Sequence, residues 1–195
     1  MKNSAQLVLA SSSPFRKALL TKIYPNFEAA APDIDESSRD NEPPIDLALR
    51  LAIEKAKALR SKYPNHLIIG SDQVAMLGET QLTKPGSHNN CVKQLQLSSG
   101  KMLTFYTAVC VLNSMTGDYK ADVDSCKVLM KDLTNEEIER YVKKDKPYGC
   151  AAAFKSEGLG IALFEKIEGD DPNALVGLPL IKLIKLLNQM GFSIL

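Results

Sequence analysis

The sequence lacks an excess of charge of either sign, because its 24 Lys and Arg residues stand against 23 Asp and Glu residues. A balanced surface has no broad electrostatic field for a nucleic-acid backbone, so we expect no nucleic-acid partner. Long hydrophobic runs are also missing, and the apolar stretch at residues 7–10 is too short for a signal-peptide core or a membrane span. We therefore expect a cytoplasmic protein with no membrane partner.

Several catalytic and metal-binding motifs are absent as well. The four cysteines are widely spaced and form no CxxC pair, which argues against a disulfide framework or a zinc site. No GxxxxGK[ST] sequence is present, so the chain has no P-loop. No GxSxG sequence supports a Ser-His-Asp triad, and the two histidines have no motif partner.

The pattern of hydrophobic residues predicts a mixture of helices and strands. With 195 residues and 45% hydrophobic content, the chain can form one substantial core or two small lobes. Strands are expected at 6–11, 26–31, 67–74, 101–112, 119–130 and 159–167, and helices at 14–22, 45–62, 89–97, 134–143 and 178–190. This order indicates an α/β fold with long antiparallel strands. Because no repeat or linker interrupts it, residues 1–195 are expected to form a single domain.

The first candidate site is the serine-rich turn between the first strand and the first helix. Ser11 opens the turn, and Arg16 and Lys17 lie in the first helical turn. Free N–H groups at a helix start attract anions, whereas two cations there oppose the helix dipole. A bound phosphate would resolve this conflict, and a capped helix with a solvated basic start is the alternative.

The second candidate is Lys55, which lies in an apolar stripe of the helix at 45–62. The other members of this stripe are Ala48, Leu51, Ala52 and Leu59. A lysine in such a stripe must either extend to solvent or meet an anion.

Acidic residues supply the third candidate site. Asp72 interrupts an otherwise buried strand, and an aspartate at such a position commonly binds metal or acts as a base; a structural turn cap is the alternative. Glu36, in the polar loop at 32–44, can add a metal-binding carboxylate or simply be solvated. Lys84, which precedes Pro85 in a loop, can supply a further cation.

Read together, these motifs resemble the Maf family of nucleotide pyrophosphatases across nearly the whole chain. The matching segments are LASSSPFRK at 9–17, DIDE at 33–36, EKA at 54–56, SDQV at 71–74, KP at 84–85, FYTA at 105–108, KSEG at 155–158 and GDDPNALVGLP at 169–179. Each motif is weak alone, but all of them in this order are highly specific.

The resemblance implies a Maf/ITPase-like fold, in which a long mixed sheet with helices forms two lobes around a central cleft, often as a homodimer. It also implies hydrolysis of a nucleoside triphosphate to its monophosphate and pyrophosphate with a divalent cation, Mg²⁺ or Mn²⁺. Asp72 matches the proton acceptor and Glu36 a catalytic or metal-linked acid, so these two are the expected metal ligands. Ser11, Arg16, Lys55 and Lys84 match phosphate-contacting positions. Lys17 stands where the family usually has a second arginine, and a lysine cannot form a bidentate fork.

Three further positions, Phe15, Gln73 and Glu157, resemble the branch of the family that hydrolyses 7-methyl-GTP. Phe15 can stack on the cationic methylated base, and Glu157 can accept hydrogen bonds from the guanine edge. The alternatives are that Phe15 is a core residue and Glu157 merely exposed. Competing functions are a pyrophosphatase for other non-standard or pyrimidine triphosphates and a nucleotide-binding regulator of cell division.

Overall fold

The computed structural model describes residues 6–195, which divide into two compact units. The first unit contains the chain up to Gln73, together with Tyr106–Asp124 and Asp171–Leu195. The second contains Val74–Phe105 and Ser125–Asp170. Three long strands contribute residues to both units: β3 (His66–Leu77), β5 (Met102–Asn113) and β6 (Tyr119–Met130).

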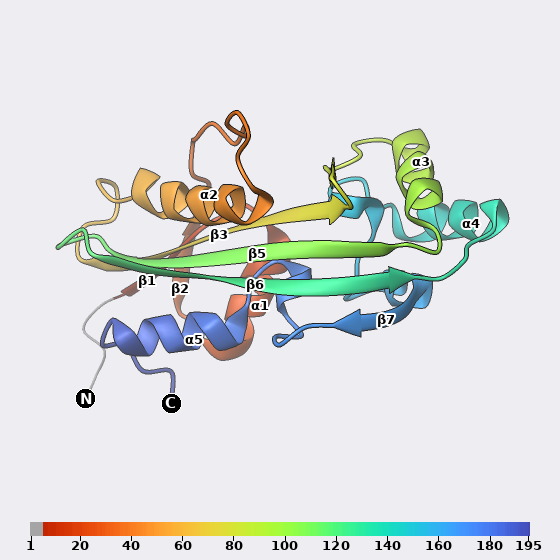
Figure 1. Cartoon of the computed structure of the whole chain (residues 1–195). Helices are drawn as coiled ribbons and strands as arrows, with labels where there is room; N and C mark the ends of the chain where they lie inside the picture. The colour runs from red at the N-terminus through yellow and green to blue at the C-terminus, as the bar shows by residue number, and fades with distance from the viewer. Residues whose placement is uncertain (1–5) are drawn as a thin grey trace. The chain divides into compact units, whose positions relative to one another are not determined.

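The strands form one mixed sheet in the order β2-β1-β3-β5-β6-β7, with β4 paired to β3. The four shorter strands are β1 (Gln6–Ala10), β2 (Phe27–Ala30), β4 (Thr80–Leu82) and β7 (Phe164–Glu168). β1 runs parallel to β2 and β3, whereas β4 and β7 run antiparallel to β3 and β6. The mixed sheet with long strands confirms the α/β fold class predicted from the sequence (Figure 1).

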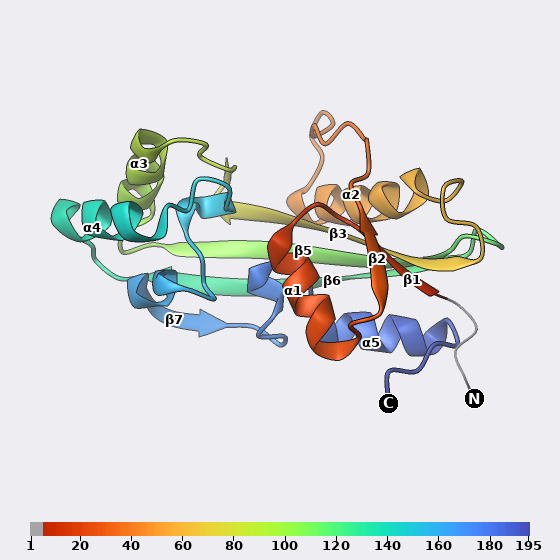
Figure 2. The same cartoon turned by 180° about the vertical axis from the view of Figure 1, so that it is seen from behind.

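Five α-helices accompany the sheet in the described part of the chain. The first unit holds α1 (Pro14–Ile23), α2 (Pro44–Ala58) and α5 (Leu180–Gln189), and the second holds α3 (His88–Ser98) and α4 (Asn135–Asp145). Figure 2 shows α1 and β2 from behind. Within residues 6–195, every helix is too short or too polar to traverse a lipid bilayer.

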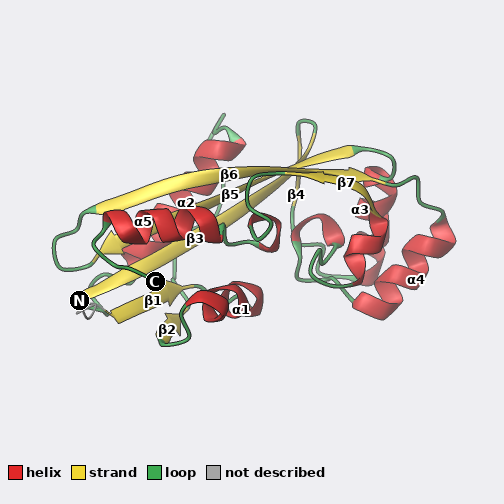
Figure 3. Ribbon diagram, turned by 90° about the horizontal axis from the view of Figure 1, so that it is seen from below, coloured by secondary structure: helices red, strands yellow, loops and turns green. Residues whose placement is uncertain are grey.

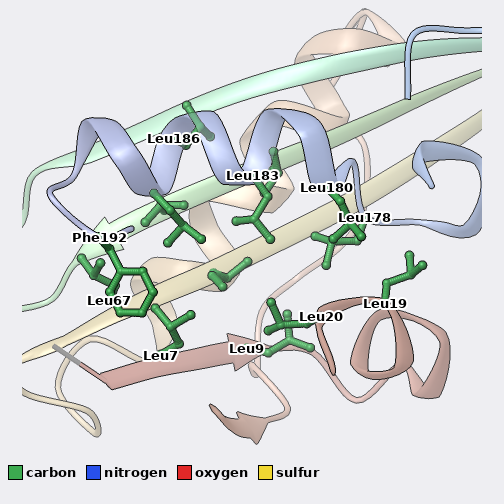
Figure 4. Close-up of a cluster of buried hydrophobic side chains, with 14 residues drawn as sticks. Leu7, Leu9, Leu19, Leu20, Leu67, Leu178, Leu180, Leu183, Leu186 and Phe192 are labelled. Carbon is green, nitrogen blue, oxygen red and sulfur yellow. The ribbon is translucent and has the colours of Figure 1, made fainter. Parts of the chain in front are cut away.

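The residues of β3 in the first unit alternate between two covered faces. Leu67 and Ile69 pair in register with Leu7 and Leu9 of β1. These four side chains join leucines of α1 and α5 in one buried hydrophobic cluster (Figure 4). On the other face, an added Cβ at Gly70 would lie 2.0 Å from the Ala52 carbonyl oxygen of α2, so only glycine permits this close contact. Successive side chains of a strand point to opposite faces. Asp72 therefore lies on the same face as Gly70, whereas Ser71 and Gln73 lie on the opposite face.

The second unit has its own core. The Phe154 ring lies 5.5 Å from Phe105 and 4.7 Å from Phe164, measured between centroids. Buried Ile138 and Val142 line one side of α4, which lies beside α3 (Figure 3). Aromatic pairs at these distances add to the free energy gained by burying the rings.

Two sequence-based boundaries were wrong by more than three residues. The strand expected at 159–167 begins as a 3-10 helix at Leu159–Leu163, and only Phe164–Glu168 is a strand. Gly160 explains this difference, because its Cα approaches the Lys155 carbonyl so closely that an added Cβ would lie 2.4 Å from the oxygen. The helix expected at 45–62 ends at Ala58, since its final N–H groups bond three residues back and tighten the last turn.

Candidate active site

Lys55 meets two anions rather than extending to solvent. Its Nζ lies 2.6 Å from Asp72 Oδ1 and 2.8 Å from Glu36 Oε1, although only 7% of its side chain is exposed. This arrangement follows from the fold, because Ile68, Gly70 and Asp72 share the face of β3 on which α2 packs. Lys55, the charged residue in the apolar stripe of α2, therefore contacts Asp72, the acidic residue of β3.

The two carboxylates differ in their surroundings. The Asp72 side chain is 11% exposed and belongs to a central strand, whereas that of Glu36 is 56% exposed and belongs to a loop. A buried ion pair recovers little more than the desolvation free energy of its charges, so it is weak evidence for a stabilising role. The contact is better explained by the chemistry that two converging carboxylates and a cation can perform.

Arg16 lies in the first turn of α1, as the sequence predicted. Ser13 caps the helix by accepting a hydrogen bond from the Arg16 N–H, and Pro14 is the first helical residue. The Arg16 Nε donates to the Gly177 carbonyl oxygen at 2.7 Å. Burial lowers the pKa of the Arg16 guanidinium, while the negative charges of Asp72 and Glu36 raise it. Arg16 is thus a half-buried cation in the electrostatic field of both candidate carboxylates.

The remaining predicted residues of this turn differ in how far they are buried. Ser11 is buried, and its Oγ accepts a hydrogen bond from the Ser13 N–H at 3.1 Å, which shapes the turn before the helix. Phe15 is half-buried and Lys17 is exposed.

The opposite face of β3 carries a second polar network. Ser71 Oγ donates to the Gly177 carbonyl oxygen at 2.9 Å. The Gln73 Nε2 donates to Thr107 Oγ1 at 3.0 Å and to the carbonyl oxygens of Ala174 and Leu175 at 3.0 and 3.1 Å. These acceptors determine the orientation of the amide, because its oxygen in this position would face three other oxygens. The nitrogen of Gln73 is therefore used within the protein.

Asp72 and Glu36 have the donor chemistry that a divalent cation needs. Both offer hard carboxylate oxygens, and Mg²⁺ is commonly held by one or two carboxylates together with waters and substrate phosphates. Within residues 6–195 no cluster of three or more His, Cys, Asp or Glu side chains could enclose an ion. The pair consequently fits an ion that is shared with a phosphate-bearing ligand, and does not fit a structural metal cage.

Two predicted site residues belong to the second unit. Lys84 lies in the loop between β4 and α3, and Glu157 lies in the turn before the 3-10 helix at Leu159–Leu163; both are exposed. Lys155 supports the Glu157 turn, since its N–H donates to Tyr141 Oη at 3.0 Å and its ammonium lies 3.6 Å from Asp145 Oδ1. The functions of Lys84 and Glu157 stay predictions.

A thiol nucleophile is disfavoured in both units. Burial raises the pKa of Cys150 to about 11 and that of Cys110 to about 12. Thiols with such pKa values are protonated at neutral pH and react poorly. Within residues 6–195 no disulfide joins any two of the four cysteines.

Sequence reasoning missed the residues that orient the site. Thr107 and Ser71 are fully buried hydroxyls within apolar strands, and this placement is the signal that could have identified them. Gly177, with φ of +118°, presents its carbonyl oxygen to both Arg16 and Ser71. Nothing in the local sequence indicates this contact, because its partners lie more than a hundred residues away.

We predict that Thr107→Val destabilises the protein by about 1–3 kcal/mol, the usual effect of leaving buried polar groups without partners. Valine lacks the hydroxyl that donates to the Ala174 carbonyl and accepts from Gln73. Thr107→Ser retains the hydroxyl and serves as the matched control. Urea unfolding measures both, and equal midpoints for the two variants would contradict the assignment.

Comparison with known proteins shows which family the chain resembles. The model of the Maf-like protein family matches residues 6–190. The chain is 49% identical over 189 residues to a 7-methyl-GTP pyrophosphatase of Nitrosococcus oceani, with 97% of this chain and 95% of that one covered. It is 53% identical over 189 residues to a 7-methyl-GTP pyrophosphatase of Colwellia psychrerythraea, with 97% and 94% covered. Among solved structures, the Ham1 protein of Staphylococcus aureus is 16% identical with a TM-score of 0.46, over 78% of this chain and 88% of that one. The first three matches show that this chain belongs to the Maf family.

Proposed function

We propose that this protein hydrolyses 7-methyl-GTP to 7-methyl-GMP and pyrophosphate, and so removes a methylated nucleotide before it can enter RNA. Family membership and two relatives of that name, each aligned over 97% of the chain, support the proposal. The observation that carries it is the Lys55 ammonium between Asp72 and Glu36. We further propose that the enzyme acts in the cytoplasm as a homodimer, with residues 1–195 as one functional domain.

Binding of the triphosphate is assigned to the cations. A nucleoside triphosphate with roughly four negative charges needs several charge-assisted contacts. Arg16 and Lys55 supply two of them, while the family motif adds Ser11, Lys17 and Lys84. The hydrogen bond from Arg16 Nε to Gly177 leaves its terminal Nη groups to donate to phosphate oxygens.

Asp72 is assigned as the base that activates water. Lys55 holds its Oδ1, so the second oxygen, Oδ2, can accept a proton from a water molecule. The water oxygen forms a bond to the α-phosphorus as the bond from that phosphorus to the bridging oxygen breaks. Pyrophosphate leaves with the bonding electrons, and the proton on Asp72 returns to solvent.

The proposed cofactor is Mg²⁺ or Mn²⁺, held by Asp72 and Glu36. When bound, a divalent cation offsets phosphate charge and favours departure of pyrophosphate. Lys55 contributes to the same site by holding Asp72 and Glu36 side by side, so that both carboxylates would face the ion. Glu36 is consequently proposed to act mainly through metal and phosphate placement.

Recognition of the base is assigned to Phe15, Gln73 and Glu157. Methylation at N7 gives guanine a positive charge, so stacking on Phe15 is worth about 0.5–2 kcal/mol. A charge-assisted hydrogen bond to Glu157 can add about 1.5–3 kcal/mol. With the two hydrogens of its nitrogen directed at three acceptors within the protein, Gln73 is proposed to use its Oε1 as an acceptor. Together these contacts would favour the methylated base over GTP.

The proposal predicts metal-dependent pyrophosphate release from 7-methyl-GTP in preference to GTP, dTTP, UTP and ITP. Initial rates with Mg²⁺ and with EDTA measure it, and EDTA should abolish release. Preference for another triphosphate would overturn the base assignment while keeping the phosphate chemistry. Nucleotide binding with no release from any substrate would instead support a regulatory protein.

The assignment of Asp72 predicts that Asp72→Asn lowers kcat by about 10²–10⁴-fold, the usual contribution of a positioned base. Asparagine keeps an oxygen for Lys55 but cannot accept the proton. Asp122→Asn is the control. Asp122 lies in β6 of the same unit and pairs with Lys182 of α5, so this variant should keep wild-type turnover. Steady-state kinetics decides, and full turnover by Asp72→Asn would refute this mechanism.

A further inference from the structure

The loop that carries Glu36 has no regular secondary structure of its own. Between β2 and α2, the chain crosses residues 31–43 without a helix or strand, and most of these residues are exposed. Nevertheless the Glu36 carboxylate lies 2.8 Å from the Lys55 ammonium. An exposed side chain on an irregular loop loses considerable conformational entropy in such a contact, so other interactions must hold the loop.

Arg50 of α2 supplies those interactions. Its Nε and Nη2 contact the two carboxylate oxygens of Glu42 at 2.6 and 2.8 Å, which is a bidentate pair. The same Nη2 donates to the Ser37 carbonyl oxygen at 2.9 Å, and Nη1 donates to Glu54 Oε2 at 2.9 Å. Only 14% of the Arg50 side chain and 9% of the Glu42 side chain are exposed. One guanidinium thus holds the residue directly after Glu36 and the far end of the loop.

The chemistry of this contact set requires an arginine. A planar fork can hold a carboxylate through two nitrogens while donating to further acceptors, whereas an ammonium cannot reproduce this geometry. The hydrogen bond from Arg50 lowers the pKa of Glu42 to about 2, assisted by the Arg39 N–H. Glu42 therefore stays ionised throughout the neutral range, and its attachment to Arg50 is independent of pH there.

We propose that Arg50 is a positioning residue that acts on catalysis through Glu36. Arg50 and Lys55 belong to the same helix, so α2 holds both the backbone beside Glu36 and the Glu36 carboxylate. Loss of Arg50 releases the loop and lets the carboxylate leave Lys55. This inference rests on the function proposed for Glu36 above, and extends it to a residue that touches neither substrate nor metal.

A double-mutant cycle tests this coupling. The kcat and KM of wild type, Glu36→Gln, Arg50→Met and the double variant are measured with 7-methyl-GTP and Mg²⁺. A misplacement of about 1 Å can cost on the order of 10²-fold, so Arg50→Met should lower kcat by about 10–100-fold with a smaller change in KM. The double variant should match Glu36→Gln alone, because Arg50 can position nothing once the carboxylate is gone. Arg50→Lys should be impaired like Arg50→Met.

Arg39→Met is the matched control, since its 69%-exposed side chain contacts only the rim of the same cluster, at Glu54. It should retain wild-type kcat. Melting temperatures confirm that each variant is folded. If Arg50→Met does not fold, Glu42→Gln replaces it in the cycle, because it weakens the same attachment while keeping Arg50.

The failures of the two proposals can be distinguished. If the effects of Arg50→Met and Glu36→Gln multiply, or if Arg50→Met keeps wild-type kcat, the positioning proposal is overturned while Glu36 keeps its role. If Glu36→Gln itself keeps wild-type kcat, the function assigned to Glu36 is wrong, and the positioning proposal fails with it.

Discussion

The contact of the Lys55 ammonium with Asp72 and Glu36 is the interaction on which the rest of the candidate site depends. It places a charge among apolar side chains, where an unpaired lysine would be costly. Both anions must therefore come from segments that the fold brings to α2, one from the central strand and one from the loop before the helix. The Lys55 nitrogen thus contacts side chains from both the strand and the loop.

The two faces of β3 carry different groups of the candidate site. On the α2 face, Asp72 meets Lys55, and the close approach at Gly70 brings helix and strand together. On the other face, Ser71 and Gln73 hold the backbone at residues 174–177, which also accepts the Arg16 hydrogen bond. Adjacent residues of one strand thus serve the carboxylate–cation group on one side and the arginine on the other.

Much of this arrangement could be predicted from residue patterns, and the rest depends on packing and backbone contacts that no residue pattern indicates. Two of these features are charged residues in apolar surroundings, Lys55 in a helix stripe and Asp72 in a buried strand. The third is a serine before a helix, the cap at Ser13. All three can be recognised from the neighbouring residues in the sequence. The 3-10 helix before β7 was missed because its cause is the close packing of Gly160 on Lys155. The network of Arg50 was missed for a similar reason, since an arginine on a helix gives no sign of the loop carbonyl it will meet.

The central claim is that an Asp72 carboxylate held by Lys55 directs water to the α-phosphorus of a nucleoside triphosphate. The most direct test is hydrolysis of 7-methyl-GTP by the wild-type enzyme in water enriched in the heavy oxygen isotope, followed by mass spectrometry of both products. The account predicts one heavy oxygen in 7-methyl-GMP and none in pyrophosphate. Label in pyrophosphate would show attack at the β-phosphorus and would contradict the assigned mechanism.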